Sequence, residues 1–188
     1  SYDLYLDGRW YSTLDQIAGH KPTDPTINHG TLSGRIPVSF RIRPERNLSM
    51  LFAPTVPTAI SRPVTLIYGP AGEDAIDLVA VEIDPMLRAG ELYEVNTRVA
   101  APTVAQLKTA GTDYPEWVLD KYLQYPIQTP ASIQDLALEI TAGLETPYEK
   151  ASAITAWLRE NIQYAPVIPD PPRGVDAIEW VLFTEKQG

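Results

Sequence analysis

The sequence predicts an α+β fold in which an antiparallel β-sandwich-like domain is followed by helices. Residues 1–101 alternate apolar and polar side chains in short runs separated by Gly and Pro, which is typical of half-buried strands. After Ala101 the apolar spacing lengthens to three or four residues, which is the helical spacing. With 44% apolar residues in 188, the chain is able to bury a core.

Residues 1–101 are expected to form the β-sandwich-like domain, because six short strands with turns between them are typical of a sandwich. Turn residues are expected at Asp7-Gly8, Gly69–Gly72 and Ala89-Gly90. A long surface loop is expected at Gly19–Gly34, where apolar residues are scarce. The six runs are Tyr2–Trp10, Pro37–Arg43, Leu48–Ala53, Pro63–Tyr68, Asp77–Ile83 and Glu91–Val99.

Residues 102–130 are expected to form connecting helices and a linker, and residues 131–188 a helical region. The connecting helices are expected at Thr103–Thr109 and Pro115–Tyr122, ended by Gly111 or by Pro126. A further helix begins at Ser132, and its expected apolar face is Ile133, Leu136, Ala137, Ile140 and Leu144.

Two helix starts near the end of the chain are marked by capping residues. Thr146-Pro147-Tyr148-Glu149 is a capping box with Pro at the first helical position, so this helix is expected to run to about Gln163. Its predicted buried stripe is Ala151, Ile154, Leu158 and Ile162, with Trp157 beside it. The prolines of 166–172 stop that helix, and Asp176 caps the next one, with Glu179 three residues on.

Charge and composition exclude several classes of function. The 15 basic residues against 24 acidic ones give a net charge of -9, which argues against nucleic-acid binding. The absence of cysteine excludes a thiol nucleophile, disulfides and thiolate zinc sites within these residues. No apolar run approaches the ~20 residues of a membrane-spanning helix.

Candidate chemical groups in the first domain are few. His20, Asp24 and His29 are conceivable ligands of a metal-dependent hydrolase, but solvated loop histidines are the simpler interpretation. Gly30–Gly34 misses the spacing of a nucleophile elbow by one residue. Gly69–Gly72 is followed by two acidic residues that would repel a phosphate, so a plain turn is expected. We therefore assign no catalytic, cofactor-binding or metal-binding residue.

Two aromatic groups stand out. Tyr2, Tyr5, Trp10 and Tyr11 lie at the start of the chain, where the alternation divides them between two faces, and Trp10 is expected in the core rather than on a binding platform. Trp157, Trp180 and Phe183 form a second group that is expected to serve in packing. The segment 178–183 is apolar on almost every side and requires a cover, either the β domain or a second copy of the chain.

Several segments carry a resemblance to a known family. They are Tyr122–Pro126, Thr146–Ala151, Trp157–Arg159 with Tyr164, and Asp176–Phe183. In these segments the sequence resembles the bacterial transglutaminase-like family of membrane-anchored, TgpA-type proteins. Tyr2–Tyr5 and Gly8–Trp10 are similar to the opening of the β region that precedes the catalytic domain in that family.

The resemblance implies a papain-like, cysteine-dependent acyltransferase or peptidase on the outer side of a bacterial membrane, tethered by helices outside this chain. Gly188 lies where the family has a glycine shortly before its catalytic cysteine, so the chain is expected to be a non-catalytic fragment, inactive alone. Its implied partners are the remainder of that domain, a protein or peptide substrate and a second copy of itself. The alternative is a stand-alone β module that binds cell-wall glycan or peptide.

Overall fold

The computed structural model describes residues 3–6, 9–124 and 129–188. Tyr2, the expected Asp7-Gly8 turn and the Tyr125-Pro126 segment lie outside the described residues. The chain divides into two compact units. The β unit comprises Ser1–Leu4, Ser12–Pro102 and Glu116–Tyr122, and the helical unit comprises Tyr5–Tyr11, Thr103–Pro115 and Leu123–Gly188.

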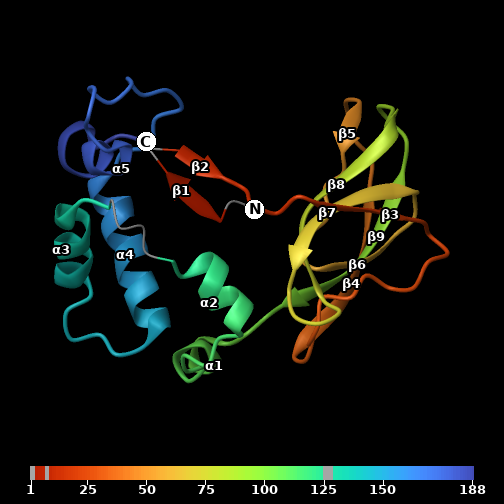
Figure 1. Cartoon of the computed structure of the whole chain (residues 1–188), viewed down its shortest axis with the longest axis horizontal. Helices are drawn as coiled ribbons and strands as arrows, with labels where there is room; N and C mark the ends of the chain where they lie inside the picture. The colour runs from red at the N-terminus through yellow and green to blue at the C-terminus, as the bar shows by residue number, and fades with distance from the viewer. Residues whose placement is uncertain (1–2, 7–8, 125–128) are drawn as a thin grey trace. The chain divides into compact units, whose positions relative to one another are not determined.

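The β unit contains two antiparallel sheets, which are labelled in Figure 1. One sheet has the order β3-β7-β8-β5 and the other the order β4-β9-β6. The strands are β3 (Gln16–His20), β4 (Arg35–Ile42), β5 (Leu48–Met50), β6 (Pro57–Ile60), β7 (Val64–Pro70), β8 (Ile76–Leu87) and β9 (Tyr93–Ala100). The mixed helix-and-sheet class with antiparallel pairing is confirmed, and each of the six predicted runs contains a strand.

One apolar core is shared by the two sheets. Its buried members are Ile27, Leu48, Leu51, Ile60, Val64, Leu66, Val81, Ile83, Leu87, Tyr93 and Val95. Tyr93 and Val95 come from β9 of the three-stranded sheet, whereas Leu66 and Val81 come from β7 and β8 of the four-stranded sheet. The two sheets therefore depend on the same buried side chains for their stability.

The segment between β5 and β6 crosses the core face of β9 and is fixed there by side-chain hydroxyls. Tyr93 donates to the carbonyl of Phe52 at 2.9 Å. The Thr97 hydroxyl, only 2% exposed, lies within hydrogen-bond reach of the carbonyls of Pro54, Thr55 and Val56. These contacts satisfy buried polar atoms that would otherwise be costly to remove from water.

The prediction of a surface loop over Gly19–Gly34 is wrong at the start of this segment and near its middle. Gly19 and His20 finish β3, where they pair with Thr65 and Val64 of β7. Ile27 is a core residue, anchored by its backbone N–H to the carbonyl of Thr58 at 2.9 Å. The prediction failed because Ile17 is followed by Ala18 and Gly19, which are depleted in strands.

Helix α2 (Glu116–Tyr122) belongs to the β unit. Lys121 Nζ donates to the carbonyl of Pro70 at 2.7 Å, and the Tyr122 hydroxyl donates to the Asp77 carboxylate. The predicted helix over Pro115–Tyr122 is thereby confirmed, with Pro115 as its N-cap. Both contacts reach the paired ends of β7 and β8 next to the turn that joins them, so they fix α2 on the β unit.

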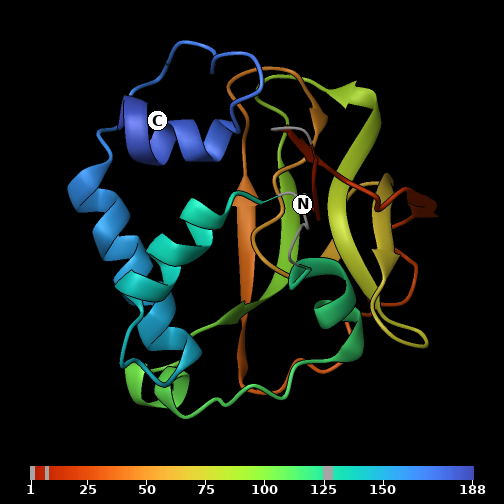
Figure 2. The same ribbon diagram turned by 60° about the vertical axis from the view of Figure 1, so that its left-hand side comes forward.

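The helical unit contains α1 (Val104–Lys108), α3 (Ala131–Ile140), α4 (Pro147–Asn161), α5 (Ala177–Trp180) and a π-helical turn, η1 (Val181–Glu185). It also holds most of the hairpin β1 (Leu4–Leu6) and β2 (Arg9–Tyr11). The predicted capping box of α4 is confirmed, since Thr146 accepts from the N–H of Glu149, whose side chain returns to Thr146. Figure 2 shows α3 lying beside α4, with α5 near the end of α4.

The apolar faces of the helices are only partly covered. The predicted face of α3 is confirmed as its less exposed side, since all five of its residues are half-buried. The predicted stripe of α4 is wrong in part, because Ala151 is exposed and Leu158 is 38% exposed, while Ile154, Ile162 and the neighbouring Trp157 are half-buried. Neither α3 nor α4 contains a fully buried residue. No helix within the described ranges is both long and apolar enough to cross a membrane.

Candidate functional site

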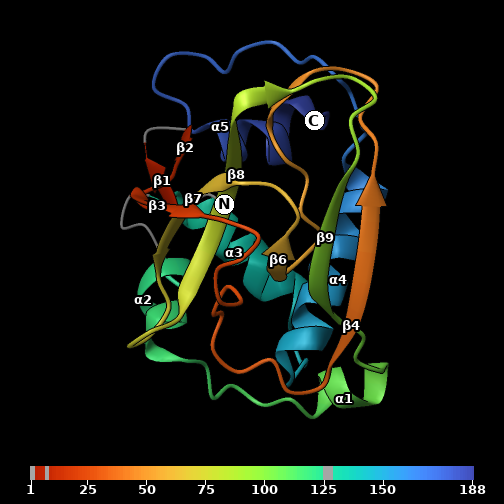
Figure 3. The ribbon, with the colours of Figure 1, turned by 90° about the vertical axis from the view of Figure 1, so that its right-hand side faces the viewer.

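The most highly organised polar contacts of the helical unit gather at the start of α5. Asp176 is the N-cap, and its Oδ1 accepts from the backbone N–H groups of Ile178 at 2.9 Å and Glu179 at 3.1 Å. Its Oδ2 accepts from the Tyr5 hydroxyl at 3.0 Å. The hairpin β1–β2, which lies beside α5 in Figures 1 and 3, is thus linked by a side-chain hydrogen bond to the cap of that helix.

This environment changes the acidity of Tyr5. Burial of the phenol, the hydrogen bond to Asp176 and the negative charge of that carboxylate together raise the pKa of Tyr5 to about 12. Each of these effects disfavours the phenolate. Burial removes water from the charge, the hydrogen bond requires the phenol proton, and a phenolate would be a second anion beside Asp176. Tyr5 is therefore a neutral donor at physiological pH.

A second contact fixes α5 from the side of α3. The Ser132 hydroxyl in the first turn of α3 donates to the carboxylate of Glu179. Glu179 was expected as the third residue after the N-cap, and its backbone N–H does bond to Asp176. Its side chain, however, bonds to Ser132 of another helix.

The backbone leaves α-helical geometry after α5. Val181–Glu185 forms a π-helical turn, and Lys186 then adopts a left-handed conformation at φ 54° and ψ 26°. Residues 186–188 run parallel to 163–165, with hydrogen bonds from Gln163 N to Lys186 O at 2.9 Å and from Gly188 N to Gln163 O at 3.0 Å. The N–H of Ala165 donates to Gly188 O at 3.0 Å. Such π-turns are often found at functional sites.

The cover expected over 178–183 is present for one aromatic residue only. Trp180 is 8% exposed and is the one fully buried residue of the helical unit within the described ranges. Phe183 is 42% exposed. The buried Trp180 agrees with the expectation that this segment packs, whereas Phe183 is still open to water.

The histidine interpretations are corrected by the structure. His20 is buried at 8% exposure, and His29 Nε2 lies 2.7 Å from the carbonyl of Pro57, so neither is a freely solvated loop residue. Asp24 Oδ2 accepts from the backbone N–H of Lys21 in a local turn. Among the described residues no group of three or more His, Asp or Glu side chains could hold a metal ion, so these residues give the metal-dependent hydrolase no support.

The glycine-containing segments are turns. Gly30 and Gly34 have φ values of 75° and 72°, and the N–H of Gly30 donates to the side chain of Asn28. Gly69 and Pro70 end β7, and the N–H of Ala71 donates to the carbonyl of Ala75. The expected plain turn at Gly69–Gly72 is thus confirmed, although it begins within the strand.

The expectation that Trp10 lies in the core is wrong. Trp10 is 56% exposed and Tyr11 is 44% exposed. The ring of Tyr5 lies 5.1 Å from that of Trp10 in a tilted arrangement. A two-stranded hairpin has too little surface to bury both of its faces, which explains the exposure.

Sequence reasoning did not find the two positioning contacts of α5. Tyr5 and Asp176 are 171 residues apart, and Ser132 and Glu179 are 47 apart, so no local pattern connects them. It did identify Asp176 and Glu179 as the cap and third residue of the helix, because capping is a local signal.

Comparison with known proteins gives one match. No curated protein and no solved structure matches the chain. Residues 134–188 match the family model of the transglutaminase-like superfamily. The match begins inside α3 and includes α4, α5 and η1. The part of the helical unit that carries the Asp176 cap is therefore similar to the transglutaminase-like superfamily.

Proposed function

We propose that the helical unit is the supporting, non-catalytic part of a transglutaminase-like domain whose reactive cysteine lies outside these 188 residues. The observation that carries this proposal is the match of residues 134–188 to a superfamily model in helices that have almost no core of their own. The chain itself holds no cysteine. We therefore expect it to have no acyl-transfer activity alone.

Exposed apolar side chains of the helical unit support a further layer of protein over it. Leu138, Leu158 and Phe183 are 62%, 38% and 42% exposed. Covering side chains of this size contributes about 1.5 to 3 kcal/mol each.

The chemistry proposed for the complete domain is acyl transfer. A cysteine thiolate attacks the carbonyl carbon of an amide, the amine leaves with a proton from a histidine, and a thioester remains. Water then gives hydrolysis, and an amine gives a cross-link. In this scheme Asp176, Glu179, Tyr5 and Ser132 position α5 and take no part in the bond changes.

The proposal also covers the role of the β unit and the cellular location of the protein. We propose that the two sheets with their common core form a sandwich-like module that orients the catalytic domain or presents a protein substrate to it. The family resemblance suggests a membrane-anchored protein of the TgpA type, with this region on the outer side of a bacterial membrane.

The direct test is the amino-acid sequence that follows Gly188 in the natural protein. We expect an aromatic residue and then cysteine within a few positions. The longer protein should release ammonia or an amine from glutamine-containing peptides, and a cysteine-to-serine variant should not. A following sequence without cysteine, or amide hydrolysis by the 188-residue chain itself, contradicts the proposal.

The exposure of Trp10 favours a second candidate, a module that binds cell-wall glycan. Exposed aromatic rings are suitable platforms for sugars, and Trp10 and Tyr11 are 56% and 44% exposed on one hairpin. Trp117 of α2 is half-buried, with its ring edge-on to that of Tyr122, and serves as the control. Retention of the whole chain on cell-wall fragments, lost on Trp10→Ala but kept on Trp117→Ala, would favour this candidate. Equal retention of both variants would exclude a role for Trp10.

A further inference from the structure

We propose that strand β4 is a docking edge for an extended acidic peptide that has apolar side chains at alternate positions. β4 has eight residues and forms one edge of the sheet β4-β9-β6. Figure 3 shows it running alongside β9. This proposal rests on the β unit alone and is independent of the catalytic family proposed for the helical unit.

The directions of the backbone groups in β4 follow from the hydrogen bonds of β9. The N–H of Arg98 donates to Val56 O, and Glu94 O accepts from Ser61 N, so both residues of β9 face the β6 side. Asn96 lies between them and faces the same way, since its carbonyl accepts from Thr58. Alternate residues of a strand point their N–H and C=O groups to opposite edges.

The register then identifies the open groups of β4. Arg98, Asn96 and Glu94 lie opposite Pro37, Ser39 and Arg41. The backbone groups of these three β4 residues must therefore point away from β9, toward the free edge. Pro37 has no N–H to offer there, which is the position where an edge strand tolerates proline. Ser39 and Arg41 each offer an N–H and a carbonyl to an incoming strand.

The side chains of β4 favour an incoming strand whose apolar residues lie on the core side of the sheet. Val38, Phe40 and Ile42 alternate on the core side of β4 and are only half-buried, although Ile42 packs against the core. On the other face the Ser39 hydroxyl donates to Asn96, and Arg41 pairs with Glu94 at 2.8 Å. An added strand with alternate apolar residues would extend the apolar face and leave the polar one in water.

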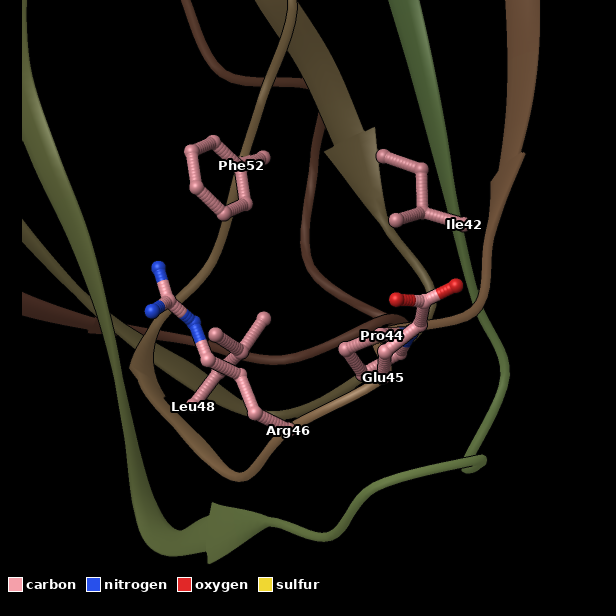
Figure 4. Close-up of a pocket in the computed structure, with 6 residues that line it drawn as sticks. All are labelled: Ile42, Pro44, Glu45, Arg46, Leu48 and Phe52. Carbon is pink, nitrogen blue, oxygen red and sulfur yellow. The ribbon is translucent and has the colours of Figure 1, made fainter.

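A pocket of about 520 Å³ lies at the end of β4 and would accept one of the apolar side chains. Ile42, Pro44, Leu48 and Phe52 give it apolar walls, and Phe52 is 64% exposed. Figure 4 shows Arg46 on the side of Phe52 and Glu45 on the side of Ile42.

The positive charge around β4 favours an acidic peptide over a second copy of the chain as the partner of this edge. The segment 35–46 contains Arg35, Arg41, Arg43 and Arg46 but one acidic residue, Glu45, in a protein of net charge -9. Two β4 edges paired with each other would bring these arginines together, and like charges across strands are destabilising. An acidic strand is attracted to the same edge.

The test uses a fluorescent, end-blocked peptide of four Glu-Val repeats and the whole 188-residue chain, with binding followed by anisotropy. Ser39→Pro removes an edge N–H that has no role in the β4–β9 ladder, and we expect it to weaken binding about tenfold or more. The matched control, Ser39→Ala, keeps that N–H and should bind like the parent chain. Arg46→Glu and Phe52→Ala should each weaken binding.

A peptide control applies even if Ser39→Pro does not fold. N-methylation of one alternate set of peptide amides should abolish binding, whereas methylation of the other set should be tolerated, because the two sets face opposite edges. Equal binding of both methylated peptides, equal binding by Ser39→Pro and Ser39→Ala, or no binding at millimolar peptide overturns the proposal. A dimer of the chain that Ser39→Pro dissociates overturns the peptide as occupant.

Discussion

Replacement of Asp176 should show how much the contacts at the start of α5 contribute to the free energy of unfolding. Asp176→Ala removes the cap of two N–H groups and the acceptor of the Tyr5 hydroxyl. Loss of an N-cap costs about 1 kcal/mol, and a hydrogen bond to a charged group contributes about 1.5 to 3 kcal/mol. We therefore expect the free energy of unfolding of the helical unit to fall by about 2 to 4 kcal/mol.

The assay is urea unfolding of a parent chain in which Trp10, Trp117 and Trp157 are replaced by Phe, so that the fluorescence reports the buried Trp180, combined with a double-mutant cycle. Tyr5→Phe alone removes one hydroxyl, and the coupling between Tyr5→Phe and Asp176→Ala should be about 1 to 2 kcal/mol. Asp176→Asn is the matched control for the cap alone, because asparagine caps nearly as well but has no charged acceptor for the Tyr5 hydroxyl, so it should cost about 1 kcal/mol less than Asp176→Ala. Additive effects of Tyr5→Phe and Asp176→Ala would refute the contact between the hairpin and α5.

The pH dependence gives the same contact a second readout. The pKa of Tyr5 is raised from 10.0 to about 12, so the folded state favours the neutral phenol. This stabilisation is complete below pH 10 and is lost as the pH rises toward 12. In a spectrophotometric titration, Tyr5→Phe should remove one of the latest-ionising tyrosines. If it instead removed a tyrosine that ionises near pH 10, the hydrogen bond to Asp176 would be refuted.

Further predictions concern stability. Thr97→Val should lower the free energy of unfolding by about 1 to 3 kcal/mol, because buried carbonyls lose their donor, while the exposed Thr55→Val should change it by less than about 0.5 kcal/mol in the same urea titration. Thr146→Ala should destabilise α4 by about 1 kcal/mol, seen as lower helicity on heating, and an unchanged melting curve would contradict its capping role. Leu87→Ala, at a 2% exposed core position, should cost about 2 to 5 kcal/mol, whereas Leu138→Ala, at 62% exposure, should be nearly neutral; equal costs would disprove the difference in packing between the units.

Local signals predicted the elements that depend on local contacts. The capping residues Thr146 and Asp176 are read from neighbouring residues, and both helix starts are where the sequence placed them. β4, β7, β8 and β9 also follow from predicted runs of six or more residues. The sequence predicted these elements because neighbouring residues determine them.

Features that depend on distant partners could not be predicted. β3 is a strand because β7 pairs with it, although it contains Ala18 and Gly19, which are depleted in strands. His20 is buried and Trp10 exposed for the same reason, since burial depends on what covers a face rather than on the residue type. The predicted buried stripe of α4 was wrong at Ala151 and Leu158, because a periodic pattern identifies an apolar face but not what covers it.

The central proposal is that the helices of 134–188, which match the transglutaminase-like superfamily, lack a core of their own and are completed by further protein. Hydrogen exchange of the 188-residue chain tests it most directly, because protection reports the free energy of local opening. We expect the amides of α3 and α4 to exchange at least about a hundredfold faster than those of β7–β9, and to become protected in a natural protein that continues beyond Gly188. Protection of α3 and α4 equal to that of β7–β9 in the 188-residue chain would contradict the claim.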